Sequence, residues 1–280
     1  MLSYRHLFHA GNFADVFKHA LLARLIAALC AKDKPWCYLE THAGTGRYDL
    51  AHPWARKTRE YESGIARLWG RKDLPALLAP YMAVVQAANP AHELKFYPGS
   101  PQIARWLARP GDRLVLAELN KTDCAGLQKL FARDRQVHVQ LMDGYQALKA
   151  FLPPEERRGL TLIDSSFDRA REFERITAAL AEAHARFATG IYAVWYPLME
   201  KSAMRAFVRE VQKTGIRKIL RLELVVEPGD WTLTVPGCGM LVVNPPWKFE
   251  EEARALLDWL WLELANEGAG GARVDWLAPE

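Results

Sequence analysis

Four acidic residues in this chain each stand at the end of an apolar or strand-like run: Glu40, Glu118, Asp143 and Asp164. The runs that precede them are 36–39, 114–117, 137–142 and 159–163. In a doubly wound α/β sheet the carboxyl ends of the parallel strands meet at one edge, and such sheets bind nucleotide-like cofactors there. We therefore expect these carboxylates to lie around one site, where they can accept hydrogen bonds from a ribose, an adenine or an amino group.

The first of these acids opens a glycine-bearing turn, Glu40-Thr41-His42-Ala43-Gly44-Thr45-Gly46. Two glycines two residues apart let the backbone pass close to a ligand where any Cβ would collide. We expect a strand over 36–40, then this turn, then the start of a helix whose unpaired N–H groups and dipole face the ligand. Gly44 is therefore a candidate cofactor contact.

The residues that this turn lacks decide between cofactors. A dinucleotide fingerprint, G-x-G-x-x-G, would need glycine where Asp49 stands. A phosphate loop needs a glycine followed by Lys-Ser or Lys-Thr, and the sequence has none at that spacing. The remaining pattern, acidic-x-x-Ala-Gly-x-Gly, resembles the first motif of S-adenosylmethionine (SAM) dependent methyltransferases. A purely structural turn of the same sequence is the alternative.

Composition and charge are ordinary for a globular enzyme, with half of the residues hydrophobic, a quarter charged and a net charge of +4. That mild basic excess is compatible with nucleic acid as a partner. The four cysteines form no CxxC pair and the histidines near the N-terminus lack a carboxylate cluster at metal spacing, so we expect no disulfide and no metal. Without an apolar run of membrane-spanning length or a secretory signal, we expect a cytoplasmic protein, and we take it to be a monomer.

The order of apolar runs predicts one Rossmann-like α/β domain over residues 1–280. A helix capped by Asn12 or Asp15 comes first. Five strands follow, at 36–40, 114–118, 137–141, 159–163 and 190–196. A last pair, 218–226 and 240–243, is expected to close the sheet as an antiparallel edge hairpin.

Residues 52–110 are predicted to be an inserted helical subdomain that shapes a substrate pocket. Within it, Ser100 is placed to cap a helix. The insertion also carries a basic and aromatic mixture that suits nucleic acid, although a solvated helical face fits equally well: Trp54, Arg56, Lys57, Arg59 and Tyr61.

A second basic feature consists of cations at every fourth residue, Lys201, Arg205, Arg209 and Lys213, before a C-cap glycine, Gly215. On a helix all four lie on one side across roughly 18 Å. This face either contacts the phosphate backbone of an RNA or is simply exposed to solvent, and the sequence favours neither alternative.

Segments from nearly the whole chain resemble the ribosomal RNA large subunit methyltransferase J family. They are Tyr4-Arg5-His6, His9-Ala10-Gly11-Asn12, Asp15, Lys18-His19, Thr41-His42-Ala43-Gly44, Tyr97-Pro98-Gly99-Ser100-Pro101, Thr189-Gly190-Ile191-Tyr192-Ala193, Gly215-Ile216-Arg217-Lys218-Ile219-Leu220 and Asn244-Pro245-Pro246-Trp247-Lys248. The resemblance implies a class I SAM-dependent methyltransferase fold and methyl transfer to N6 of an adenine in 23S rRNA. It also implies cofactor contacts at Lys18, His19, His42, Ser100, Glu118, Asp143, Gly144 and Asp164. Asp164 would be the catalytic residue as well, and Tyr4, Ser165 and Phe167 would contact the RNA.

The sequence departs from the family where the family carries Asp-Pro-Pro-Tyr, because Asp164-Ser165-Ser166-Phe167 stands here. Transfer to an adenine amine needs two acceptors for its protons and an aromatic face for the flipped base. Asp164, the Ser165 carbonyl and the Phe167 ring retain these groups. Two prolines fix backbone φ and two serines do not. The hypothesis is that the site binds SAM but transfers the methyl group slowly or not at all.

Other interpretations of the same residues stay open. Asn244-Pro245-Pro246-Trp247 is a rival base-binding motif that fits better in shape and worse in chain order, and we favour Asp164. A DNA adenine-N6 methyltransferase uses the same chemistry, while Ser165 and Ser166 suit a non-catalytic, SAM-binding RNA-binding protein. A cytosine-C5 methyltransferase is disfavoured because no Pro-Cys or Thr-Cys dipeptide occurs.

Overall fold

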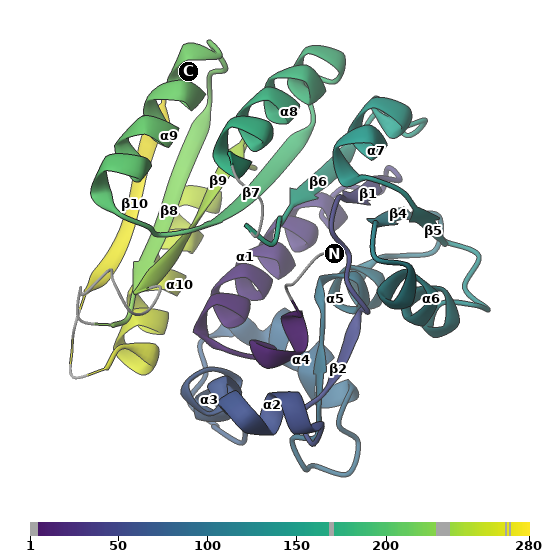
Figure 1. Ribbon diagram of the computed structural model, residues 1–280, viewed down its shortest axis with the longest axis vertical. Helices are drawn as coiled ribbons and strands as arrows, with labels where there is room; N and C mark the ends of the chain where they lie inside the picture. The colour runs from purple at the N-terminus through teal and green to yellow at the C-terminus, as the bar shows by residue number, and fades with distance from the viewer. Residues whose placement is uncertain (1–4, 168–170, 228–235, 267, 269) are drawn as a thin grey trace.

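One eight-stranded sheet runs through the computed structural model, which describes residues 5–167, 171–227, 236–266, 268 and 270–280 (Figure 1). The strand order is β10-β8-β9-β7-β6-β1-β4-β5. The bounds are β1 Cys37–Glu40, β4 Arg113–Glu118, β5 Val137–Leu141, β6 Gly159–Ile163, β7 Ile191–Pro197, β8 Ile219–Val225, β9 Gly237–Val243 and β10 Gly271–Ala278. Strands β1, β4, β5, β6 and β7 pair in parallel and the other three antiparallel, which confirms the predicted Rossmann-like sheet.

Helices cover both faces of this sheet (Figure 1). One face packs against α7 Gly144–Phe151, α8 Glu172–Arg186 and α9 Lys201–Lys213. The other packs against α1 Phe13–Cys30, α5 Ser100–Leu107 and α10 Phe249–Leu264, with α6 Lys121–Leu130 beside β4 and β5. Each face therefore has its own hydrophobic core.

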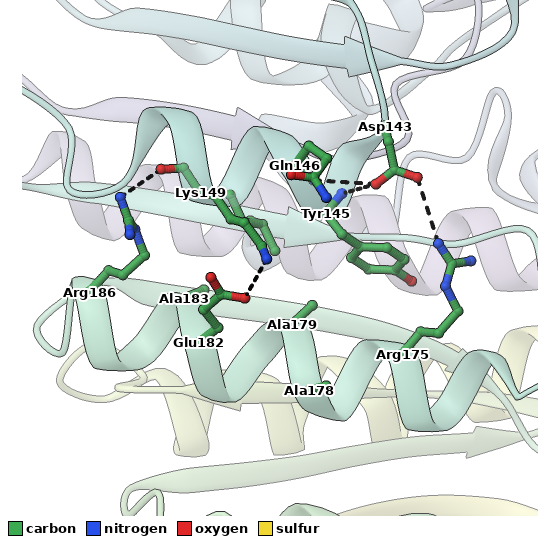
Figure 2. A pocket seen from close by; sticks show the side chains of 11 residues that line it. Asp143, Tyr145, Gln146, Lys149, Arg175, Ala178, Ala179, Glu182, Ala183 and Arg186 are labelled. Atoms are coloured by element: carbon green, nitrogen blue, oxygen red, sulfur yellow. Dashed lines mark hydrogen bonds and ion pairs between the residues drawn. The ribbon is translucent and has the colours of Figure 1, made fainter.

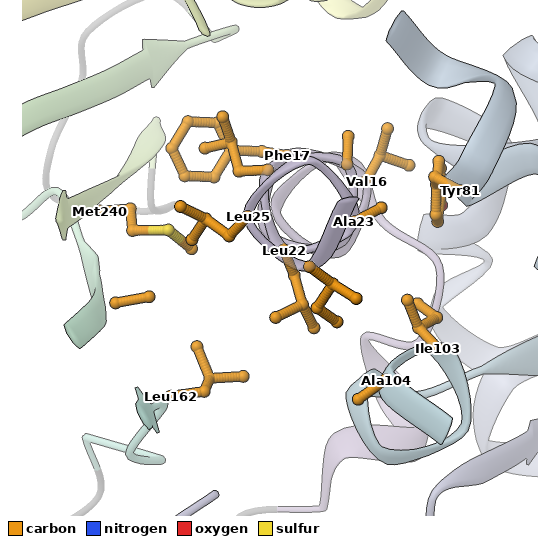
Figure 3. Packing of buried hydrophobic residues seen from close by; sticks show 14 of the residues in the cluster. Val16, Phe17, Leu22, Ala23, Leu25, Tyr81, Ile103, Ala104, Leu162 and Met240 are labelled. Atoms are coloured by element: carbon orange, nitrogen blue, oxygen red, sulfur yellow. The ribbon is translucent and has the colours of Figure 1, made fainter. Parts of the chain in front are cut away.

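Helix α1 is enclosed on all sides, which explains why its apolar residues are not confined to one face (Figure 3). Phe17 and Leu25 point toward the sheet residue Met240, while Val16 lies on the side of Tyr81. Its N-cap is Asn12, whose side chain accepts a hydrogen bond from the N–H of Asp15, as one of the two predicted caps requires. This cap fixes the residue at which the helix begins. Asp15, Lys18 and His19, in its first two turns, line the cavity described below.

The helix expected directly after the glycine turn is absent from the structure. Residues Arg47–Asp49 form strand β2 instead, which pairs antiparallel with β3 Phe96–Pro98 in a separate two-stranded sheet. The next helix, α2, begins only at Pro53. The turn after β1 therefore receives no helix dipole, and the ligand is not held at a helix N-terminus there.

The segment 52–110 contains mostly short helices, as predicted, and also β3. Its elements are α2 Pro53–Thr58, η2 Glu60–Ser63, α3 Ile65–Leu68, η3 Ala76–Leu78, α4 Ala79–Ala87 and then α5. Tyr81 and Ile103 share the core of α1, so we propose that this segment is an insertion within one domain. Ser100 is not a cap: Gly99 is the N-cap of α5, and Ser100 is its first helical residue.

The predicted hairpin of β8 and β9 is antiparallel, but it does not form the edge of the sheet. Strand β9 inserts between β7 and β8, and β10 adds outside β8 as the edge strand. The expectation of an edge hairpin was wrong because β10, at residues 271–278, was not recognised in the sequence.

Candidate active site

A cavity of about 700 Å³ opens at the carboxyl ends of β1, β4, β5 and β6. The sheet register explains which residues meet there, because Glu40 lies opposite Leu116 on β4 and Leu162 on β6. Two residues further on, Glu118 and Asp164 flank the turn that begins after β1. Chain order reverses at β1, with β4 on one side and β6 on the other, and ligands of doubly wound sheets bind at this switch point.

Glu118 and Gly44 form one wall of the cavity. Glu118 accepts hydrogen bonds from the N–H of Gly44 at 2.8 Å and from the N–H of Asn120 at 2.7 Å. These bonds fix its carboxylate, although burial raises its pKa above the usual value. Gly44 has φ +59°, a conformation that other residues rarely adopt. A fixed carboxylate beside exposed backbone suits the two hydroxyls of a ribose.

Asp143 and Gly144 line the next part of the cavity, at the start of α7. Asp143 is the N-cap and accepts from the N–H groups of Tyr145 and Gln146. A Cβ on Gly144 would lie 2.0 Å from the carbonyl oxygen of Thr41, so only glycine lets this turn approach the β1 turn so closely. The resulting narrow space suits a flat ring such as adenine.

Two histidines line the cavity, and their burial favours the neutral form of each imidazole. Burial lowers the pKa of His42 and lowers that of His19 well below the usual value. His19 Nδ1 lies 2.7 Å from the hydroxyl of Tyr97, whereas its Nε2 is buried without a hydrogen-bond partner among the described residues. Such an unpaired buried nitrogen fits a polar ligand group, because burying it alone carries a free-energy cost. With the ribose and adenine positions, it indicates that the cavity fits SAM.

Lys18 carries a buried cation between two carboxylates. Its Nζ lies 2.6 Å from Asp164 Oδ2 and 3.0 Å from Asp15 Oδ1, and its side chain is only 5% exposed. Although burial opposes the charged form of Asp15, the charges of His6 and Lys18 hold its pKa well below the usual value. The contact with Lys18 joins α1 to the end of β6 across the cavity and keeps Asp164 in one orientation.

Ser165 and Phe167 follow Asp164 along the cavity wall. The Ser165 hydroxyl donates to Glu172 at 2.6 Å. Phe167 has φ +53°, and its ring centroid lies 5.0 Å from that of Phe173 and 6.0 Å from that of Trp195. The cavity therefore brings together the predicted site residues except Glu40, which is buried beside it, and Tyr4, which lies outside the described residues.

The rival base-binding motif at 244–247 lies at the amino ends of the parallel strands, opposite the ends at which the cavity opens. Val243 ends β9 opposite Tyr192, near the start of β7, so Asn244 follows at the amino ends of the parallel strands. The Asn244 side chain donates to the carbonyls of Ala188 and Gly190 and so secures a loop. Its distance from the cavity along the sheet favours Asp164 as the base-binding acid.

Glu40 does not line the cavity, contrary to the expectation that all four strand-end carboxylates lie around one site. It is fully buried, with its carboxylate bonded to the hydroxyls of Tyr38 and Ser100. Burial raises its pKa to about 8. Glu40 therefore contributes to the positioning of Ser100, which does line the cavity.

Glu40 gives a prediction for the pH dependence of stability. Because its folded pKa is raised, its contribution is complete below the unfolded pKa near 4.5 and is lost as the pH rises through about 8. Between about pH 6 and about pH 9 we expect Glu40→Gln, which cannot ionise, to lose about 3 kcal/mol less stability than the parent chain loses. The folded pKa lies about two units above pH 6, and each unit corresponds to ~1.4 kcal/mol. Urea unfolding across this range measures the difference, and parallel curves for the two chains would contradict the buried state of Glu40.

Sequence reasoning missed one side of the cavity, formed by His6, His9, Asn12 and Glu60. His9 Nδ1 and Asn12 Nδ2 each lie 2.9 Å from the Glu60 carboxylate, which joins the N-terminal segment to η2. Hydrogen bonding to Glu60 raises the pKa of His9 despite its partial burial. The crowding of histidines in the first 20 residues was the available signal.

A second cavity of about 460 Å³ lies between α7 and α8 (Figure 2). Asp143 and Arg175 line both cavities, 3.6 Å apart at their nearest charged atoms. Among the described residues no group of three or more potential ligands is placed to hold a metal ion. In the same part of the chain, no helix has the length and apolar character needed to span a bilayer.

Comparison with known proteins gives full-length matches. Residues 33–278 match the family described as RsmJ: Ribosomal RNA large subunit methyltransferase D, RlmJ. The chain is 47% identical over 280 residues to "Ribosomal RNA large subunit methyltransferase J" of Escherichia coli (strain K12), covering 100% of both chains. It is 43% identical over 281 residues to the protein of the same name from Haemophilus influenzae (strain ATCC 51907 / DSM 11121 / KW20 / Rd), again with 100% of both covered.

The fold matches a solved structure over nearly the whole length of both chains. The crystal structure of protein LPL1258 from Legionella pneumophila str. Philadelphia 1 superposes with a TM-score of 0.87 at 41% identity, over 95% of this chain and 97% of that one.

Proposed function

Because the chain belongs to the RlmJ family of ribosomal RNA large subunit methyltransferases, it is a SAM-dependent rRNA methyltransferase, and we propose that it methylates N6 of an adenine in 23S rRNA. The observation that supports this acceptor is Asp164, a carboxylate that lines the same cavity as the proposed cofactor contacts. We further propose that the protein acts as a monomer in the cytoplasm, where its substrate is made.

The proposed cofactor contacts are those that line the cavity. Glu118 would hold the ribose, Asp143 and Gly144 the adenine, and Gly44, His19, His42, Lys18 and Ser100 the remaining polar groups. When bound, SAM supplies an electrophilic methyl group on a positively charged sulfur. The carboxylates around the cavity suit that positive charge.

The protein's own part in the reaction is to orient the acceptor amine. The lone pair of an adenine amino group is delocalised into the ring, so acceptors that take its two protons in hydrogen bonds favour attack. Lys18 Nζ donates a hydrogen bond to Asp164 Oδ2, and among the described residues no donor is bonded to Asp164 Oδ1. We propose that Oδ1 and the carbonyl of Ser165 accept these hydrogen bonds, while the ring of Phe167 stacks on the flipped base. Tyr4 is proposed to contact the RNA on the same side.

The experiment that tests this function is transfer of a tritiated methyl group from SAM to 23S rRNA that lacks the modification, followed by nucleoside analysis. We expect N6-methyladenine as the product. Stronger incorporation into duplex or single-stranded DNA in competition would instead support DNA as the substrate. Cofactor binding by calorimetry without any turnover would support a non-catalytic RNA-binding protein, and a rate far below that of an Asp-Pro-Pro-Tyr relative would support the impairment attributed to Ser165 and Ser166.

Helix α9 gives a prediction for RNA binding. Lys201, Arg205, Arg209 and Lys213 are all exposed, and the helix begins two residues after Met199, which lines the cavity. Only Lys213 has an ion-pair partner among the described residues, Glu210 at 2.7 Å.

We expect replacement of all four cations by alanine to reduce the slope of log affinity against log salt by about 3, since each phosphate contact on single-stranded nucleic acid contributes ~0.7. Filter binding of an rRNA fragment at several salt concentrations measures the slope. The matched control replaces four exposed lysines elsewhere: Lys32, Lys34, Lys72 and Lys129. Equal slopes for the two variants would contradict a phosphate contact along α9.

A further inference from the structure

The Asp164–Phe167 segment lacks the two prolines that would stiffen it, yet a buried side chain holds it. The hydroxyl of Ser165 donates to Glu172 Oε1 at 2.6 Å, and the two residues are 5% and 4% exposed. Glu172 is the first residue of α8, across a short connection from this segment. A hydrogen bond to a buried carboxylate is charge-assisted and stronger than a neutral one.

Glu172 is itself fixed by two further donors. The hydroxyl of Tyr145 donates to the same oxygen, Oε1, at 2.5 Å, and Nη1 of Arg175 donates to Oε2 at 3.0 Å. Three donors from three separate positions therefore hold one carboxylate. A buried carboxylate satisfied in this way has little freedom to move, since displacement would break several charge-assisted bonds at once.

These partners extend to the cofactor side of the cavity (Figure 2). The N–H of Tyr145 donates to Asp143 Oδ1 at 2.9 Å, and Arg175 lies 3.6 Å from Asp143 Oδ2. The guanidinium of Arg175 also lies 4.7 Å from the centre of the Tyr145 ring. Glu172 therefore connects the turn proposed to bind adenine with the segment proposed to bind the target base.

The segment needs such support because its last residue is strained. Phe167 adopts φ +53°, a backbone conformation that residues other than glycine seldom adopt. Such a conformation persists only when the surrounding structure holds the residue in it. Ring contacts with Phe173 and Trp195 hold Phe167 from one end. The bond from Ser165 to Glu172 holds the segment from the other end.

We propose that Glu172 is a positioning residue: its carboxylate clamps the Ser165 hydroxyl and thereby fixes Asp164 and the Ser165 carbonyl for the acceptor amine. The clamp takes the place of the stiffness that a Pro-Pro pair gives to the backbone. This inference rests on the proposed function only in taking Asp164 and Ser165 as the acceptors of the amine. If Glu172 acts in this way, the Asp164–Phe167 segment is held in place although it has serines where the family has prolines.

The test compares Ser165→Ala, Glu172→Ala and the double variant. Misplacing a reacting group by about 1 Å can cost about 100-fold, so we expect kcat to fall between about 10-fold and about 100-fold in each single variant. The double variant should be no slower than the slower single variant, because both changes break the same bond. Calorimetric Kd for SAM should change less than about fivefold.

The control is Glu174→Ala, in the same first turn of α8, whose carboxylate pairs with Arg171 at an exposed position. It should keep the parent kcat. Ser165→Ala removes one hydroxyl and is the variant to trust if Glu172→Ala unfolds, and thermal midpoints identify that case. Unchanged kcat in Ser165→Ala, losses that multiply in the double variant, or losses matched by SAM affinity would each overturn the proposal.

Total tritium incorporated into rRNA is recorded separately from the identity of the methylated nucleoside. If the product is another nucleoside but total incorporation still falls in Ser165→Ala and Glu172→Ala, the clamp stands and the proposed target is wrong. If the product is N6-methyladenine and incorporation is unaffected, the target stands and the clamp is wrong.

Discussion

Replacing Asp164 by asparagine is expected to lower kcat for methyl transfer by about 10²–10³-fold, the range found when one preorganised polar group is removed from an active site. The reason is the direction that Lys18 imposes. Lys18 Nζ lies 2.6 Å from Asp164 Oδ2 and would draw the amide oxygen of an asparagine toward itself. The amide NH₂ would then occupy the position of Oδ1 and face the adenine amine, so that two donors meet where a donor and an acceptor are required.

The measurement is kcat with saturating SAM and saturating unmodified 23S rRNA, together with calorimetric Kd for SAM. Glu118→Gln is the comparison, because Glu118 lines the same cavity on the side proposed for the ribose. We expect Glu118→Gln to weaken SAM binding more than it lowers kcat, and Asp164→Asn to do the reverse. Parent-like kcat in Asp164→Asn would mean that the acceptor of the amine is another group.

The positions of Glu118, Asp143 and Asp164 could be predicted because each follows a strand that is recognisable from its apolar run. Parallel pairing then brings the strand ends together without any information on side chains. Glu40 shows the limit of this reasoning. All four residues of β1 are buried, so period-two alternation could not show which of them points away from the cavity.

Short and distant pairings were beyond sequence reasoning. Strand β2 has three residues and pairs with β3 about 50 residues later, so its apolar pattern is too short to distinguish a strand from the start of a helix. Strand β10 mixes exposed and buried positions irregularly, as an edge strand with one covered face does.

The Ser165–Glu172 contact illustrates a different limit. From the sequence we predicted a less rigid segment, because Ser-Ser stands where the family has Pro-Pro and serine does not fix backbone φ. A hydroxyl adds a donor as well as freedom, and whether that donor finds a buried acceptor depends on where α8 begins. The consequence of the substitution therefore became visible only with the packing of α7 and α8.

Replacing Lys18 by methionine is expected to lower the free energy of unfolding by about 3–5 kcal/mol, because it leaves buried carboxylates without their cation. Asp15 is 1% exposed, and among the described residues it would keep His6 and the Gly11 N–H as hydrogen-bond partners of its carboxylate. Asp164 would lose the contact that fixes its orientation, so kcat should also fall, by about 100-fold for a displacement of about 1 Å. Urea unfolding and single-turnover methyl transfer measure the two effects.

The loss of stability should depend on pH in a defined direction. Because the folded pKa of Asp15 is lowered in the parent chain, its contribution is present above the unfolded pKa near 3.8 and is lost as the pH falls through the folded pKa. The stability difference between parent and Lys18→Met should therefore shrink as the pH falls below about 3.8. Arg24→Met is the control on the same helix, since its pair with Glu252 is partly exposed and such pairs contribute about 1 kcal/mol or less. A difference for Lys18→Met that is equally small, or that grows at low pH, would mean that the buried cation does not hold the two carboxylates together.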